Sequence, residues 1–159
     1  MNVTALQVLW STLVAIIYDS PAESSLRSQL RENVRDSEFY LPSNGFEYDQ
    51  RRRVTNGACR DMRPAAIVVP RSKEAVSDAI VWARQIGLEI SVRSGGHSYT
   101  CTSIRQGGLH LDLRQLDKVD LLADETAVRL GPGSTWYHVL YFLPPSKYTI
   151  IHGNCGSVG

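Results

Sequence analysis

The sequence is short of the features that mark several common protein classes. Its 159 residues include only three cysteines, with no C-x-x-C pair, which argues against a dense disulfide framework. No internal repeat is visible, so a solenoid is excluded. The formal net charge is +1, and such a small charge predicts no nucleic-acid partner. No apolar stretch is long enough to cross a bilayer comfortably, so no membrane-spanning anchor is expected.

Several catalytic motifs are also missing. The sequence has no H-E-x-x-H and no Gly-Lys-Ser/Thr, and the segment Cys155–Gly159 has cysteine where a nucleophile elbow needs its first glycine. These absences disfavour a protease, an ATPase and an esterase. What the sequence does have is 43% hydrophobic and 21% charged residues. That composition is typical of a globular domain with a core.

The N-terminal residues 1–22 have two interpretations. Residues 5–18 are apolar and are followed by Ser20-Pro21-Ala22, an arrangement typical of a cleaved signal peptide. No basic residue precedes the apolar run, which favours instead the buried first helix of a cytoplasmic protein. Of the two, the sequence slightly favours a secreted protein. The domain itself is expected to cover residues 23–159.

Helical and extended patterns alternate along the rest of the chain. Ser72 is a good N-cap and Gly87 a good helix end, and together they predict a helix between two apolar strands. Such a strand–helix–strand unit commonly holds ligands at the carboxyl ends of its strands. The pattern predicts helices over 24–36, 48–54, 73–86 and 136–143 (the last capped by Ser134), strands over 63–70, 88–92, 109–113, 119–122, 127–130 and 148–151, and a loop over 39–46.

One of these strands leads into the sequence Arg93-Ser94-Gly95-Gly96-His97-Ser98. Adjacent glycines let the backbone turn sharply and leave its N–H groups unobstructed, so the loop can hold an anion such as a pyrophosphate. The arginine and the two serines would lie close to that anion, with His97 at the lip of the loop. On spacing alone, a plain glycine turn with a surface histidine is the simpler interpretation.

The three cysteines leave two further interpretations open. A single bridge between Cys59 and Cys101 could form if the protein is secreted. Alternatively, the pairs His97/Cys101 and His152/Cys155 could together bind zinc. The strands that enter these pairs do not resemble a compact zinc module, so no metal site is expected.

Three segments together resemble the N-terminal part of a flavin-linked oxidase. They are Arg63–Pro70 (RPAAIVVP), Val92–Tyr99 (VRSGGHSY) and Gly153–Gly159 (GNCGSVG). The resemblance is to the superfamily of vanillyl alcohol oxidase and p-cresol methylhydroxylase (PCMH), and within it to the berberine-bridge-enzyme-like (BBE-like) group, which includes carbohydrate oxidases. It covers about residues 48–159 and implies an α+β fold. The expected fold is a two-subdomain FAD-binding domain of the PCMH type, C-terminally truncated, with its first subdomain ending near Val92.

The resemblance also implies how the cofactor would be held. In this group the backbone of the first loop, here Arg93–Ser98, binds the FAD pyrophosphate. The loop histidine, matched by His97, is bonded to the 8α-methyl carbon of the flavin, and a cysteine matched by Cys155 is bonded to carbon 6. Imidazole and thiolate are both nucleophiles suited to such bonds. A valine at the position of Val158, just before Gly159, is associated with access of oxygen to the flavin, which implies an oxidase.

The implied activity is hydride transfer from an alcohol or carbohydrate-type small molecule to bicovalently attached FAD, with molecular oxygen as the acceptor. No catalytic residue is implied within this chain, because the segments that carry the general base and the substrate pocket in the group have no match here. The alternative is a non-catalytic module, zinc-stabilised or without flavin. His110 and His138 are interpreted as surface or fully hydrogen-bonded structural residues.

Overall fold

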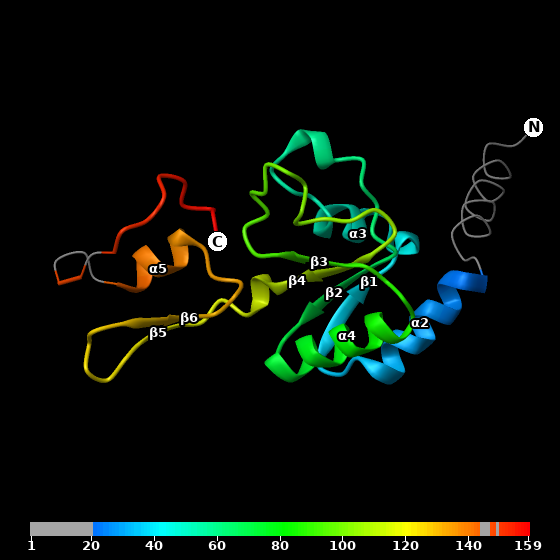
Figure 1. The fold of residues 1–159 in the computed structure, drawn as a ribbon, viewed down its shortest axis with the longest axis horizontal. Helices are drawn as coiled ribbons and strands as arrows, with labels where there is room; N and C mark the ends of the chain where they lie inside the picture. Colours follow the sequence, from blue (N-terminus) through cyan, green and yellow to red (C-terminus); the bar gives the residue numbers. More distant parts are fainter. Residues whose placement is uncertain (1–20, 144–146, 149) are drawn as a thin grey trace, which may run out of the picture.

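A four-stranded sheet and a two-stranded sheet organise the protein (Figure 1). The computed structural model describes residues 21–143, 147–148 and 150–159, so the signal peptide or first helix expected over 1–22 lies almost wholly outside the described residues. The elements are α2 (Pro21–Asn33), β1 (Ser37–Tyr40), α3 (Phe46–Arg51), β2 (Ala66–Pro70), α4 (Lys73–Gln85), β3 (Ile90–Arg93), β4 (Leu109–Asp112), β5 (Val119–Leu121), β6 (Val128–Leu130) and α5 (Trp136–Phe142).

The larger sheet has the strand order β1-β2-β4-β3. Strand β1 pairs antiparallel with β2, whereas β2, β4 and β3 run parallel, with Leu109 of β4 opposite Ala66 on one side and Ile90 on the other. The expected strand–helix–strand unit is therefore present as β2, α4 and β3, with β4 inserted between its two strands. Parallel strands bring their carboxyl ends to one edge, where the loops after β3 and β4 lie.

Helix α4 forms where the capping residues and the apolar periodicity agree. The Ser72 hydroxyl accepts a hydrogen bond from the Ala75 N–H at 3.2 Å, which satisfies one free donor of the first turn. Gly87, with a φ of +74°, follows the helix end, and glycine adopts this left-handed conformation without steric cost. Ala79 and Trp82 lie on the buried face, next to the sheet.

The two faces of the larger sheet are covered differently. Helices α2 and α4 lie side by side on one face, while α3 and the loops lie on the other (Figure 1). The first face is apolar and includes Leu30 of α2 and Leu111 of β4, both almost fully buried. On the second face, Tyr48 of α3 packs on Ile67 and Val69, and its hydroxyl donates to the Pro64 carbonyl at 2.7 Å. The same face carries the polar residues of β3 and β4 beneath the glycine-rich loop.

The smaller sheet, β5 and β6, lies beside α5 in a separate part of the fold (Figure 1). Two glycines make the close connection between it and the preceding segment. A Cβ on Gly131 would lie 2.1 Å from the Leu116 carbonyl oxygen, and one on Gly133 would lie 1.9 Å from that of Leu113. The expected subdomain boundary near Val92 is wrong, because β4 completes the first sheet, and the chain enters the second unit only after Leu116.

Three local predictions are also wrong. Residues 39 and 40, expected in a loop over 39–46, are the end of β1, because this short edge strand pairs with β2 although its sequence lacks clear alternation. Tyr148, Ile150 and Ile151 are not in a strand, since no neighbouring strand offers them a ladder within the described residues. The N-cap of α5 is Thr135, whose N–H donates to the His138 ring at 3.2 Å; the Ser134 hydroxyl instead donates to the Asp117 carbonyl.

Within residues 21–143, 147–148 and 150–159, every helix is too short or too polar to cross a bilayer.

Candidate functional site

The two glycine-rich turns singled out in the sequence pack directly against each other. We call residues 94–99, which follow β3, the glycine loop, and residues 152–159, which follow α5, the cysteine loop. A Cβ on Gly95 would lie 2.3 Å from the Ser157 carbonyl oxygen, and a Cβ on Gly159 would lie 2.0 Å from the Ser94 hydroxyl. Only glycine allows contacts this close. The two predicted turns, which are far apart in the sequence, therefore form one site.

His97 and Cys155 meet at a single hydroxyl group. The His97 Nε2 atom lies 2.8 Å from the Ser157 Oγ atom, and the same oxygen lies 3.3 Å from the Cys155 Sγ atom. The thiol is exposed and is free. Its hydrogen bond with the Ser157 hydroxyl, aided by backbone hydrogen bonds from Ser157 and Val158, lowers the pKa of Cys155. A lower pKa increases the thiolate fraction, and the thiolate is the nucleophilic form of cysteine.

The glycine loop presents free backbone donors. Within the described residues, the N–H groups of residues 95–98 donate no hydrogen bond to the protein. Gly96 has a φ of +78°, and consecutive N–H groups in such a turn form a concave site for an anion. The Gly96 carbonyl oxygen accepts a hydrogen bond from the Thr55 N–H at 3.0 Å. The backbone of the loop therefore fits the anion-binding role predicted for it.

Arg93 lies directly beneath the glycine loop. The guanidinium points inward, where its Nη1 donates to the Arg51 carbonyl at 2.8 Å, and the residue is only 8% exposed. A Cβ on Gly96 would lie 2.9 Å from the Arg93 Nε atom, so the side chain packs beneath the loop. Burial lowers the pKa of Arg93 to about 10. Arg93 supports the loop from behind instead of lining its front.

A buried carboxylate balances the arginines under the loop. Asp112, at the end of β4, is fully buried and forms two hydrogen bonds with the Arg114 guanidinium, at 2.7 and 2.5 Å, and an ion pair with Arg51 at 3.5 Å. Burial by itself raises the pKa of Asp112, but the Arg114 hydrogen bonds and the nearby charges of Arg114 and Arg93 outweigh it and lower the pKa. The negative charge of Asp112 thus holds together a layer of charged side chains, Arg51, Arg93, Asp112 and Arg114, on which the glycine loop lies. We call it the arginine–aspartate layer.

His110 is fully buried beside this layer, which sequence reasoning missed. Its Nδ1 atom lies 3.2 Å from the Ser91 hydroxyl, and within the described residues its Nε2 atom has no partner. The interpretation of His110 as a surface or fully hydrogen-bonded residue is therefore wrong. Burial lowers the pKa of His110 to about 4, so the ring is neutral at pH 7. The alternation in β4 correctly placed His110 on the polar face of the strand. It could not show that loops cover that face.

The remaining predicted residues hold the two loops in place. The Ser94 hydroxyl donates to the Ser134 carbonyl at 3.2 Å. Ser98 turns back into its own loop, where its hydroxyl lies 2.8 Å from that of Thr102. In the cysteine loop, the carbonyl of Val158 accepts a hydrogen bond from the first N–H of α5, on Trp136, at 3.0 Å. The structure thus brings Ser94 and Val158 into the contact region and places Ser98 at its edge.

Cys59 and Cys101 form a disulfide bond. The sequence had left this bridge open and had also offered Cys101 as half of a zinc pair with His97. A sulfur in a disulfide is not a thiolate ligand, so that zinc site cannot form with the bond intact. Within the described residues, no three histidine, cysteine, aspartate or glutamate side chains lie close enough together to hold a metal ion.

Comparison with known proteins gives the family. Residues 64–159, more than half of the chain, match the family described as FAD binding domain. The chain belongs to this family. It is 38% identical over 99 residues to the chitooligosaccharide oxidase of Gibberella zeae, a match that covers 60% of the chain and 20% of that protein. The family match over residues 64–159 includes both the glycine loop and the cysteine loop.

Solved structures extend the similarity to the fold of this FAD binding domain. BBE-like 1 from Physcomitrella patens superposes with a TM-score of 0.74 at 28% identity, over 84% of this chain and 29% of its own. The glucooligosaccharide oxidase of Acremonium strictum, described with a 6-S-cysteinyl, 8α-N1-histidyl FAD, superposes with a TM-score of 0.70 at 28% identity, over 82% and 28%. The predicted α+β, PCMH-type fold and BBE-like resemblance are confirmed. The chain spans only 20% to 26% of the length of the first three curated relatives.

Proposed function

We propose that this chain is the cofactor-binding part of an FAD-dependent oxidase in which His97 and Cys155 both bond covalently to the flavin. The observation that carries the proposal is the pair of contacts made by the Ser157 hydroxyl, at 2.8 Å to His97 and 3.3 Å to Cys155. The 8α-methyl group and carbon 6 belong to the same ring of the flavin, so two tethers require two nucleophiles side by side. An imidazole and a free thiol held by one oxygen meet that requirement.

The hydrogen bonds of the Ser157 hydroxyl allow both His97 and Cys155 to be in their nucleophilic forms. A hydroxyl has one proton to donate, and we assign that of Ser157 to the Cys155 thiolate, whose pKa it lowers. The Ser157 oxygen then accepts the proton on His97 Nε2. The other ring nitrogen, Nδ1, has no partner within the described residues, and in this tautomer it carries the reactive lone pair. The histidyl N1 linkage named for the glucooligosaccharide oxidase is consistent with this assignment.

The glycine loop would hold the pyrophosphate of FAD. The free N–H groups of residues 95–98 supply the donors, and the buried Arg93 behind the loop supplies positive charge. These donors, the thiol and the imidazole together fit FAD. Bound FAD would accept a hydride from the substrate and pass the electrons to oxygen. The residues of this chain bind and orient it, and the substrate pocket is assigned to other parts of the protein.

The proposed substrate is an alcohol or carbohydrate-type small molecule, and the proposed acceptor is molecular oxygen. Support comes from relatives named as oligosaccharide oxidases and from Val158, a small apolar side chain in the cysteine loop. We also propose that the protein is secreted. The Cys59–Cys101 disulfide supports this, because such bonds form and persist chiefly in oxidising compartments.

Acid precipitation of the intact protein tests the two tethers. Wild-type protein should keep its yellow colour in the pellet, His97→Ala should keep it through Cys155, and Cys155→Ala should keep it through His97. The double variant should release all FAD to the supernatant. Colour retained in the pellet of the double variant would mean that neither residue is an attachment point.

A further inference from the structure

The glycine loop and the residues after it, 94–108 in all, are bound by a second segment, residues 55–65, which we call the clamp segment. Residues 94–108 contain no helix or strand, so no ladder fixes their backbone. Instead the clamp segment runs beside them in the same direction. Near its start, the Thr55 N–H donates to the Gly96 carbonyl, and near its end, the Ala65 N–H donates to the Gly108 carbonyl at 2.9 Å.

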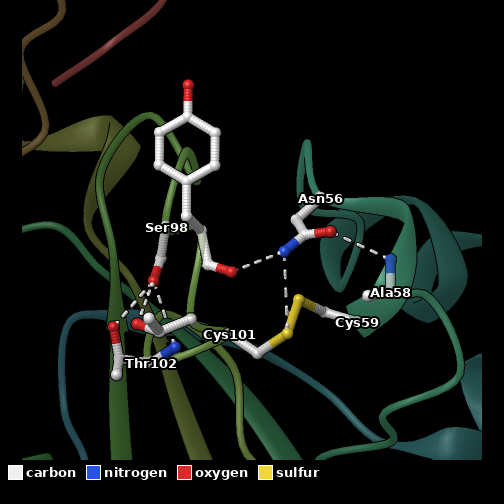
Figure 2. Close-up of a disulfide and its surroundings, with 8 residues drawn as sticks. Asn56, Ala58, Cys59, Ser98, Cys101 and Thr102 are labelled. Carbon is white, nitrogen blue, oxygen red and sulfur yellow. Dashed lines mark hydrogen bonds between the residues drawn. A yellow bond between two sulfur atoms is a disulfide. The ribbon is translucent and has the colours of Figure 1, made fainter.

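Two side-chain connections lie between these ends (Figure 2). The Asn56 Nδ2 atom donates to the Tyr99 carbonyl at 2.9 Å, and its Oδ1 atom accepts from the Ala58 N–H at 3.0 Å. The second contact fixes the orientation of the amide, so that its donor faces the loop. Farther along, the Cys59–Cys101 disulfide joins the two segments covalently. Cys59 is fully buried, which anchors the bond in the protein interior.

His97 lies between two of these fixed points. The carbonyl of Gly96, directly before it, is held by Thr55, and the carbonyl of Tyr99, two residues after it, is held by Asn56. Just beyond, Cys101 adopts a φ of +59°, a left-handed conformation that residues with a Cβ rarely adopt without support. The backbone that carries His97 is therefore set by contacts that do not include the cysteine loop.

We propose that Asn56 and the Cys59–Cys101 disulfide are positioning elements that preset the glycine loop for attachment of His97 to the flavin. This inference rests on the proposed function. A reacting nitrogen must lie within about 3 to 3.5 Å of its target in the correct direction, and small displacements slow such a step strongly. Cys155 is on the other loop, and within the described residues its hydrogen bonds are to Ser157 and Val158 and not to the clamp segment, so its own attachment should not depend on the clamp.

The disulfide also removes a competing thiol from the site. Cys101 is four positions after His97, and with Cys101 bonded to Cys59 the free thiol within the described residues is that of Cys155. Loss of Cys59 alone would release the Cys101 thiol, whereas loss of both cysteines would not. Comparing Cys59→Ser with the double variant Cys59→Ser/Cys101→Ser therefore separates positioning from competition.

The test follows each attachment separately in the intact protein. Protein produced under riboflavin limitation is given FAD, and acid-stable flavin is measured over time by absorbance and located by peptide mass. In a Cys155→Ala background only His97 can react. There, Asn56→Ala, the isosteric Asn56→Asp and the double serine variant should attach flavin roughly 10- to 100-fold more slowly than their parent. In a His97→Ala background the same changes should leave the rate at Cys155 within about twofold of its parent, since ordinary surface effects are small.

Asn33→Ala is the matched control, because Asn33 makes one exposed hydrogen bond to Gln29 within α2. If the double serine variant fails to fold, Asn56→Asp carries the test, since it keeps the shape and the acceptor for Ala58 but replaces the donor to Tyr99 with a negatively charged oxygen. Equal slowing at His97 and Cys155, or unchanged rates at His97, would overturn the proposal. Slowing by Cys59→Ser but not by the double variant would overturn it in favour of thiol competition. Absence of acid-stable flavin in the unmodified protein itself would overturn the proposed function as well.

Discussion

The two loops that form the site are held by very different means. The glycine loop leaves a strand of the larger sheet, has the arginine–aspartate layer behind it, and is bonded to the clamp segment. The cysteine loop has no such backing within the described residues, and its residues 152–155 are all exposed. It is held by two hydrogen bonds from the first turn of α5, to Gly156 and Val158, and by the glycine loop itself.

Because the two loops are held differently, substitutions in them should have different effects. Changes around the glycine loop remove buried contacts, so they should act mainly on the free energy of unfolding. Changes in the cysteine loop remove few buried contacts, so they should act mainly on the chemistry at Cys155. The two loops touch at Ser94 and Gly95, ahead of Gly96 and Tyr99, which the clamp segment holds, so the clamp and the contact between the loops can be altered separately.

The largest effect is expected at Asp112. Asp112→Asn would leave Arg114 and Arg51 without their buried partner, and breaking a buried ion pair in this way costs about 3 to 5 kcal/mol. Chemical denaturation of the intact protein measures it. The exposed pair between Glu89 and Arg105 supplies the control: Glu89→Gln should leave the free energy of unfolding nearly unchanged.

The loss of stability caused by Asp112→Asn should depend on pH. The pKa of Asp112 is lower in the folded protein than its ordinary value, so its charge stabilises the fold above the unfolded pKa of about 3.9. That stabilisation is lost as the pH falls through the folded pKa. The gap between wild type and Asp112→Asn should be full near pH 7 and should shrink below about pH 4. A gap that stayed constant down to pH 2 would contradict a charge effect.

The next largest effect distinguishes the cysteines. The Cys59–Cys101 bond closes a loop with a sequence separation of 42, and removing such a constraint costs about 3 to 4 kcal/mol in the chain-entropy account. Cys59→Ser/Cys101→Ser should therefore lower the melting temperature clearly. Cys155→Ser, in the exposed loop, should leave it unchanged. Similar losses for both changes would remove the contrast between the two loops.

A smaller effect is expected where the loops touch. A methyl group at Gly95 would lie 2.3 Å from the Ser157 carbonyl oxygen, so Gly95→Ala should push the cysteine loop away while the sheet side remains folded. Covalent attachment through Cys155 should then slow roughly tenfold, and attachment through His97 should slow less. Gly57→Ala is the matched control for attachment through Cys155, because a Cβ there has no heavy atom within 4 Å and the clamp segment is not expected to act on Cys155.

The smallest expected effect is on the thiol itself. The Ser157 hydroxyl is the main cause of the lowered pKa of Cys155, so Ser157→Ala should raise that pKa. The rate of alkylation by iodoacetamide, followed against pH in flavin-free protein, should reach its midpoint at a higher pH in the variant. Ser157→Thr keeps the hydroxyl and should restore the wild-type midpoint. An unchanged midpoint in Ser157→Ala would contradict the assigned proton of Ser157.

Local signals were sufficient to predict most of the fold. Ser72 and Gly87 mark the ends of α4, and the apolar runs mark β2, β3 and β4, because in each case capping, periodicity and burial agree. Strand β1 escaped prediction because this edge strand packs only two partly buried side chains, Phe39 and Tyr40, on opposite faces, and so resembles a loop. The boundary near Val92 was wrong because β4 joins strands that precede it in the chain, and pairing order is not visible in a local pattern.

Part of the site could also be predicted, through residue types rather than contacts. The Gly-Gly turn, His97 and Cys155 are recognisable as a set, and the structure brings them together. The inward turn of Arg93, the buried His110 and the role of Ser157 depend on which surfaces cover β3 and β4. The alternation Leu109-His110-Leu111-Asp112 gave the signal that His110 and Asp112 share a face with the glycine loop.

Peptide mapping of the wild-type holoprotein tests the central claim most directly. After denaturation and digestion, the peptide that contains His97 and the peptide that contains Cys155 should elute as one yellow species. Its mass should equal that of both peptides joined through a single FAD. Recovery of the two peptides separately and unmodified, with FAD free in solution, would contradict the account.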